Sequence, residues 1–273
     1  MFRYRAWNVN GPGEWSEVSY LVAASTPARP PAPKYGSSTD DSITLLFSPS
    51  SDDGGKIITS MELEVSPRLT TSWTQLANYD GMSMSYTATV ATDGLTAFAH
   101  YRFRIRAVNE YGSSEYSEEV VLSVAPLPSK LPQVTKDQAY SSDTSTMVRW
   151  VDPGTDTEPI LGYRLQLTDQ VTEERTTIYN APTNPNVLEF LAANLVKGRS
   201  YGFEVLAINF NGAGEQWSDV ASFRACSVPV TVPLPVVTEQ SATQLSFVWT
   251  APEDDGGCVI SSYDLFVDNK ATG

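Results

Sequence analysis

Acidic residues gather beside glycine in three short stretches of the chain, and carboxylates are the side chains here that are best suited to bind a cation. The stretches contain Asp52 and Asp53; Asp152, Asp156 and Glu158; and Glu253, Asp254 and Asp255. Carboxylate oxygens are preferred ligands of calcium, so Asp52, Asp53, Asp254 and Asp255 are candidate calcium ligands. The simpler interpretation, which we favour, is that each aspartate caps a sharp turn that the following glycine permits.

The residue types needed for catalysis are scarce. The chain has one histidine, His100, and two cysteines, Cys226 and Cys258, which are too few for a typical zinc site. No nucleophile motif, phosphate-binding loop or dinucleotide fingerprint is present. We therefore expect no enzymatic activity and no cofactor, with His100 in a turn near the start of a strand.

Composition narrows the class of partner. The 273 residues carry a net charge of -14, and a nucleic-acid partner would require a basic surface that this sequence lacks. No apolar run approaches the roughly 20 residues that span a bilayer, so we expect no membrane insertion in this segment. The expected partner is therefore protein, including further copies of the same chain.

The sequence repeats itself with a period of about one hundred residues, which indicates several copies of one structural unit. Seven residues recur at a spacing of 100: Leu95, Tyr101, Phe103, Ile105, Ala107, Asn109 and Gly112 match Leu195, Tyr201, Phe203, Val205, Ala207, Asn209 and Gly212. A third copy survives near the N-terminus at Phe2, Tyr4, Ala6, Asn8 and Gly11.

Each copy has the alternating pattern of short β-strands. Tyr101, Phe103, Ile105 and Ala107 are expected to face the core, and the intervening arginines at 102, 104 and 106 to face water. Similar runs are predicted as strands at 42–47, 58–65, 73–76, 86–90, 119–124, 147–150, 160–167, 176–179, 187–191, 245–249 and 260–267. About seven short strands per hundred residues with no helical window predict a two-sheet sandwich.

These motifs together resemble the fibronectin type III domain. The resemblance rests on the aromatic residue of the second strand (Phe47, Trp150 and Trp249), on the pairs Leu95 with Tyr101 and Leu195 with Tyr201, and on the aromatic-serine step at Trp15, Tyr116 and Trp217. It implies an all-β chain of tandem immunoglobulin-like sandwiches. It also implies a tyrosine corner at Tyr101 and Tyr201, and structural roles in the core for the aromatic residues of the second strand.

Proline-rich couplers divide the repeats at 26–33, 126–132 and 228–235. The predicted domains are a C-terminal part at 1–26, complete domains at 27–128 and 129–229, and an N-terminal part at 230–273. We expect this chain to be a section of a longer array, with the couplers acting as short, semi-rigid spacers.

The resemblance also suggests a disulfide. It places Cys226 at the C-terminal pole of one domain and Cys258 at the N-terminal pole of the next, where they could meet across the junction. The equivalent positions elsewhere hold Ala24 with Lys56, and Ala125 with Glu158 or Pro159. Two separate free thiols are the alternative.

The expected function is a non-enzymatic structural or adhesive segment of a large protein. It would be an elongated rod at the cell surface or in the matrix that mediates protein–protein contacts or filament assembly. One alternative is an intracellular cytoskeletal or ciliary scaffold. Others are the accessory stalk of a secreted enzyme and a receptor ectodomain. No Arg-Gly-Asp motif is present to support integrin binding.

Overall fold

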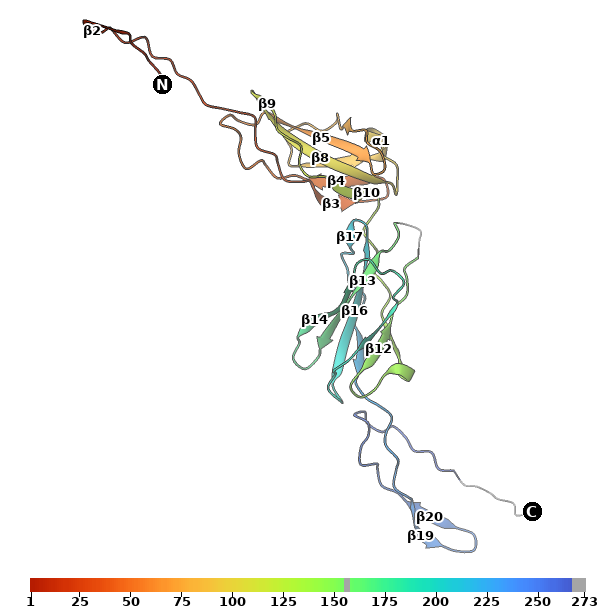
Figure 1. The fold of residues 1–273 in the computed structure, drawn as a ribbon. Helices are drawn as coiled ribbons and strands as arrows, with labels where there is room; N and C mark the ends of the chain where they lie inside the picture. The colour runs from red at the N-terminus through yellow and green to blue at the C-terminus, as the bar shows by residue number, and fades with distance from the viewer. Residues whose placement is uncertain (155–157, 267–273) are drawn as a thin grey trace. The chain divides into compact units, whose positions relative to one another are not determined.

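Short β-strands form nearly all of the regular structure in the computed structural model, which describes residues 1–154 and 158–266 (Figure 1). The chain divides into two units, Met1–Pro126 and Leu127–Gly273, and each has a hydrophobic core built from its own residues. The all-β fold class predicted from the sequence is confirmed.

The first unit contains two sheets that pack over one core. The smaller sheet has the order β3-β4-β7, with β3 (Lys34–Ser38), β4 (Ser42–Leu46) and β7 (Ser85–Thr89). The larger has the order β10-β8-β5-β6, with β10 (Val120–Ser123), β8 (His100–Asn109), β5 (Ser60–Pro67) and β6 (Thr74–Gln75), and β9 (Gly112–Ser113) also pairs with β8. Ile43 and Leu45 from one sheet and Leu63, Phe103 and Ile105 from the other are fully buried. The core therefore lies between the sheets, as the period-two pattern predicts.

A short helix in this unit was not predicted from the sequence. It is α1 (Val90–Asp93), directly after β7. The hydroxyl of Thr89 accepts a hydrogen bond from the Thr92 N–H at 3.0 Å, and Gly94 ends the helix at φ 68°. A cap at each end stabilises a single turn that is too short to show a helical pattern in the sequence.

The second unit repeats the two-sheet arrangement. One sheet has the order β11-β12-β15, with β11 (Thr135–Asp137), β12 (Thr146–Arg149) and β15 (Glu189–Ala192). The other has the order β14-β13-β16-β17, with β14 (Arg175–Ala181), β13 (Gly162–Asp169), β16 (Ser200–Asn209) and β17 (Gly212–Ala213), and β18 (Ala221–Arg224) pairs with β16. A 3-10 turn, η1 (Gln138–Tyr140), follows β11. Val148, Tyr163, Leu165, Phe203 and Val205 are fully buried between the sheets.

The last part of the second unit departs from the prediction. Up to residue 266, where the described part of the chain ends, the regular structure there is the hairpin of β19 (Val236–Gln240) and β20 (Leu245–Val248). The strand predicted at 260–267 is absent over 260–266. No strand lies beside this segment in the described chain, so its backbone has no ladder to join. For the same reason Trp249 is 40% exposed, whereas Phe47 and Trp150 are 8% and 5% exposed.

Two short strands complete the first unit near the N-terminus. β1 (Trp7–Asn8) pairs with β2 (Gly11–Pro12), and an isolated bridge joins Phe2 to Ser19.

Candidate functional site at the acidic turns

The first acidic turn is stabilised by its own aspartates. The carboxylate of Asp52 accepts a hydrogen bond from the Gly54 N–H, and that of Asp53 accepts one from the Gly55 N–H, each at 2.8 Å. Both glycines have positive φ, 72° and 78°, a region that other residues rarely adopt. This is the Asp-Gly turn of the simpler interpretation.

Ser25, directly before the first coupler, and Ala28, within it, are attached to this turn through main-chain atoms. The N–H groups of Ser25 and Ala28 donate to the carbonyls of Gly54 and Asp52, each at 2.9 Å. A Cβ on Gly54 would overlap the carbonyl oxygen of Ser25. Glycine at position 54 thus permits both the turn and the close approach of the coupler.

Asn109 joins the coupler and the turn to the end of β8. Its side-chain amide donates to the Ser25 carbonyl at 2.7 Å and to the Asp53 carbonyl at 2.8 Å, and the residue is only 4% exposed. The sequence analysis did not assign this role. The recurrence of Asn8, Asn109 and Asn209 at the repeat spacing was the signal that could have indicated it.

The third acidic turn repeats the first. Asp254 and Asp255 accept from the N–H groups of Gly256 and Gly257 at 2.8 Å. Ser227 donates to the Gly256 carbonyl at 3.0 Å, and Val230 to the Asp254 carbonyl at 3.1 Å. Two turns far apart in the sequence therefore hold their couplers by the same pair of backbone hydrogen bonds.

The second acidic turn is only partly described. Asp152 accepts from the Gly154 N–H at 2.9 Å, and Glu158 is buried at 3% exposure. Asp156 lies outside the described residues, as does Val267 of the last predicted strand.

Two further contacts cross the junction at the third turn. Lys197 forms ion pairs with Asp254 and, at 3.6 Å, with Asp143. The Lys197 ammonium, followed by the Gly256 N–H, holds the pKa of the Asp254 carboxyl below its usual value. A Cβ on Gly257 would lie 2.9 Å from the Gly198 nitrogen, so the two glycine backbones are close together.

The cysteines lie at this same junction. Cys226 and Cys258 form a disulfide in the structure, with 5.7 Å between their Cα atoms. Cys226 directly precedes Ser227, and Cys258 directly follows Gly257. The disulfide therefore spans the coupler and the turn that receives it.

The geometry of the turns shows how far their aspartates are available to bind a calcium ion. One oxygen of each of Asp52, Asp53, Asp254 and Asp255 already accepts a backbone hydrogen bond. Among the described residues, no group of three or more histidine, cysteine or acidic side chains lies close enough together to hold a metal ion. Calcium binding at these aspartates stays the less favoured of the two hypotheses, and calcium titration by calorimetry would check it.

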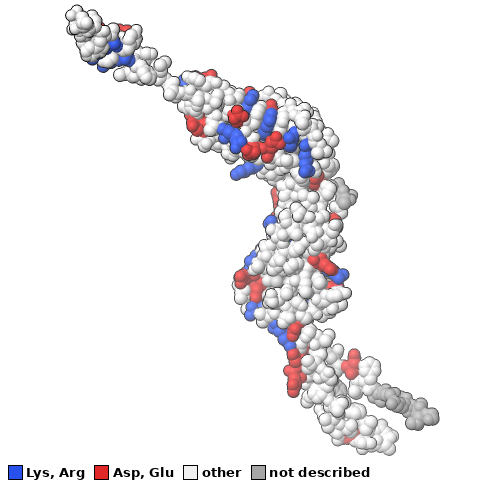
Figure 2. Space-filling view, in the orientation of Figure 1, with Lys and Arg blue, Asp and Glu red and all other residues white. Residues whose placement is uncertain are grey.

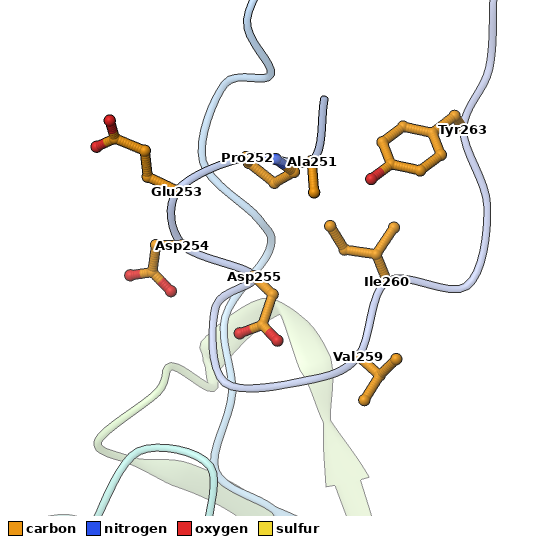
Figure 3. A pocket seen from close by; sticks show the side chains of 8 residues that line it. All are labelled: Ala251, Pro252, Glu253, Asp254, Asp255, Val259, Ile260 and Tyr263. Carbon is orange, nitrogen blue, oxygen red and sulfur yellow. The ribbon is translucent and has the colours of Figure 1, made fainter. Parts of the chain in front are cut away.

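A hollow beside the third turn is shown in Figure 3. Ala251, Ile260 and Tyr263 gather on one side of it, whereas the side chains of Glu253 and Asp254 point away from them. The equivalent residues of the preceding domain, Ile160 and Tyr163, belong to its buried core. The hollow therefore corresponds to core positions of a sandwich and presents no converging polar groups for a small ligand.

The arginines of β8 lie on the outer, partly exposed face of the sheet, as the alternation predicts, but aromatic rings pack between them. Arg102, Arg104 and Arg106 alternate with two aromatic rings, because Trp73 lies between the first two and Tyr116 between the last two. The distances from guanidinium carbon to ring centre are 4.9, 4.0, 3.9 and 4.6 Å along this stack. Their carboxylate partners are, in the same order, Glu119, Glu64 and Glu62.

Basic and acidic side chains are accordingly interleaved over the first unit (Figure 2). Burial, followed by a hydrogen bond to Glu64, raises the pKa of Tyr116 to about 12. Because the charges are paired within the unit, this face is a cation–π stack that stabilises the larger sheet and not an anion-binding surface.

The predicted tyrosine corners have the expected geometry. The Tyr101 hydroxyl accepts the Thr96 N–H, and the Tyr201 hydroxyl accepts the Val196 N–H, both at 2.9 Å. Leu95 and Leu195 are buried beside them in the two cores. The indole nitrogen of Trp150 is buried without a hydrogen-bond partner, which explains why Phe47 can occupy the same place in the first unit.

Comparison with known proteins agrees with this architecture. The family profile described as the fibronectin type III domain matches residues 30–123 and 133–224. The chain belongs to the fibronectin type III family. Both matches lie inside the complete domains predicted at 27–128 and 129–229, whose bounds stay a prediction.

The relatives are much longer proteins. Fibronectin type-III domain-containing protein 3A of mouse is 27% identical over 256 residues, which covers 90% of this chain and 20% of that protein. Protein sidekick-2 of mouse is 25% identical and covers 97% of this chain and 13% of that protein. Among solved structures, the FN1-FN3 domains of chicken CNTN1 align with a TM-score of 0.45 and 16% identity, covering 82% of this chain and 76% of that one. This chain thus spans about a fifth or less of the length of these two curated relatives.

None of the helices in the described residues is long and apolar enough to cross a membrane.

Proposed function

We propose that this chain is a non-enzymatic segment of a larger fibronectin type III array and that it acts through protein–protein contacts. Its successive domains would be joined through couplers attached to acidic turns, which restrict the geometry of these joints. The observation that carries the proposal is the repeated attachment of couplers to acidic turns. Ser25 with Gly54 and Ser227 with Gly256 form equivalent backbone hydrogen bonds 202 residues apart in the sequence (Ser227 minus Ser25).

The proposal includes an extracellular or cell-surface location. The Cys226–Cys258 disulfide supports it, because disulfides persist in oxidising compartments. The partners we propose are proteins, including further copies of this chain. Sedimentation velocity over a range of concentrations tests self-association: a sedimentation coefficient that rises with concentration is expected, and a constant monomer value would contradict it.

Spin-label distances test the restricted joint directly. Val9 and Leu69 are 101% and 96% exposed and lie on opposite sides of the first coupler, so Val9→Cys and Leu69→Cys provide labelling sites. We expect a narrow distance distribution by double electron–electron resonance. Gly54→Ala should broaden it, because the added Cβ displaces the Ser25 carbonyl.

Gly94→Ala is the matched control. Gly94 also has a positive φ, 68°, but a Cβ there would meet nothing within 4 Å. It therefore reproduces the backbone strain of Gly54→Ala without disturbing the coupler. A wild-type distribution as broad as that of a freely jointed pair would contradict the proposal, and so would an unchanged distribution in Gly54→Ala.

A further inference from the structure

The junction around Cys226 has the same main-chain hydrogen bonds as the junction around Ala24, but it has two cysteines where the other has an alanine and a lysine. Cys226 precedes Ser227 as Ala24 precedes Ser25, and Cys258 follows Gly257 as Lys56 follows Gly55. Both junctions have the same pair of main-chain hydrogen bonds. Since the first junction forms without cysteines, the disulfide is not needed to create this backbone arrangement.

The other contacts at the cysteine junction are individually weak. The side chains of Lys197 and Asp254 are 36% and 44% exposed, and ion pairs at such sites contribute little to stability. Ser227, directly before the coupler, and Val230, within it, belong to no strand of the described chain, so their hydrogen bonds are not reinforced by a strand ladder.

We infer that Cys226 and Cys258 form a redox-sensitive lock on this joint, an inference that rests on the proposed function. In the oxidised state the sulfur–sulfur bond links residues 32 apart in sequence and holds the coupler against the turn. Reduction removes this covalent tie and leaves the main-chain hydrogen bonds and the ion pair, so the joint opens more readily. The first joint, which lacks cysteines, should not respond.

The reductant is a thiol, either small or carried by a protein. Its thiolate attacks one sulfur of the disulfide and forms a mixed disulfide, which releases the other cysteine as a thiol. A second thiol then attacks the mixed disulfide. Overall, two thiols transfer two electrons and two protons to Cys226 and Cys258 and leave as one disulfide. Both cysteines are only partly buried, so a thiol can reach them.

Hydrogen exchange at single-amide resolution by NMR tests the lock on the 273-residue chain. The probes are the N–H groups of Ser227 and Val230, and those of Ser25 and Ala28 serve as the internal control. With dithiothreitol we expect exchange of Ser227 and Val230 to accelerate by about tenfold or more, as local opening becomes easier, while Ser25 and Ala28 are unchanged. A non-reducing peptide map should show the Cys226–Cys258 linkage before reduction.

A double variant, Cys226→Ala with Cys258→Lys, reproduces the residues of the first junction. Without reductant it should exchange at Ser227 and Val230 at the rate of the reduced protein, and it should show no response to dithiothreitol. Two free thiols in the untreated protein would contradict the inferred lock. An exchange rate at Ser227 and Val230 that does not change on reduction would contradict it as well. Fast exchange at Ser25 and Ala28 would instead overturn the proposed function, while a reductant-dependent change at Ser227 and Val230 would still support the lock.

Discussion

Asn109 is a polar side chain almost fully withdrawn from water, with both of its amide hydrogens bonded to carbonyl oxygens. Its carbonyl oxygen also accepts the Tyr111 N–H at 2.8 Å. One side chain thus satisfies three main-chain groups from the coupler, the acidic turn and the turn that follows β8. A buried polar group of this kind is costly to truncate, because the main-chain groups that it leaves behind each lose a hydrogen bond.

Asn109→Ala should therefore destabilise the first unit by about 1–3 kcal/mol. Urea denaturation of that unit measures the effect as a lower midpoint. Asn78→Ala is the matched control, because the exposed Asn78 amide also donates to two oxygens, those of Thr92 and Asp93. The control should change stability by no more than about 0.5 kcal/mol. Equal losses in the two variants would show that Asn109 has no special role at the joint.

At this scale the sequence predicted some residues better than others. Asp52, Asp53 and the glycines after them predicted a turn because their effect is local: the side chain bonds to the backbone two residues ahead. The role of Asn109 could not be predicted in this way, since its acceptors are 84 and 56 residues away in sequence. The pairing of Cys226 with Cys258 was suggested only through the family resemblance.

Among the secondary-structure elements, the start of β8 is anchored by the tyrosine corner. The Tyr101 hydroxyl reaches back to the loop that precedes β8 and accepts the Thr96 N–H. β16 has the same arrangement, with Tyr201 and Val196. Each central strand is thereby fixed to the loop from which it emerges.

Tyr101→Phe and Tyr201→Phe should each cost about 1–3 kcal/mol, because the phenyl ring leaves a part-buried N–H without its acceptor. Thermal or urea unfolding of the affected unit measures this loss. Tyr140→Phe removes a hydroxyl from a residue that is 65% exposed and should leave stability unchanged. A wild-type midpoint for Tyr101→Phe would contradict an anchoring role for the hydroxyl.

Most strands could be predicted because their apolar residues alternate, but three features could not. The helix α1 is only four residues long and depends on its caps. The segment 260–266 has the strand pattern yet has no neighbouring strand among residues 1–154 and 158–266. The arginines of β8 were assigned to water because alternation identifies the outer face without showing that Trp73 and Tyr116 cover it.

For the whole molecule, the separate cores are the main energetic feature. The core of the first unit is made from residues 43–124, and that of the second from residues 131–225. Leu63 and Leu165 occupy equivalent places on β5 and β13, and both are fully buried. They provide a matched pair for testing whether each unit is stable by itself.

Leu63→Ala should reduce the unfolding free energy of the first unit by about 2–5 kcal/mol, and Leu165→Ala that of the second. In calorimetry, each variant should lower the temperature of one unfolding transition and leave the other transition unchanged. The double variant should show both losses additively, since distant and independent sites do not couple. Leu69→Ala, at a residue 96% exposed, is the control and should change neither transition. A single substitution that lowers both transitions would show that the cores unfold together.

The sequence period predicted this division, because each repeat contains its own set of alternating apolar residues. It did not predict how the couplers attach, since those contacts use main-chain atoms that no residue pattern reveals.

Attachment through main-chain atoms has an evolutionary consequence. A turn that binds peptide groups places few demands on the side chains of the segment it receives, so a duplicated gene segment would bring a working connection with it. Insertion, deletion or exchange of modules would then need no matching changes in the neighbouring modules. The cysteines are the exception, because one sulfur comes from each side, and a rearrangement that inherited only one would leave an unpaired thiol.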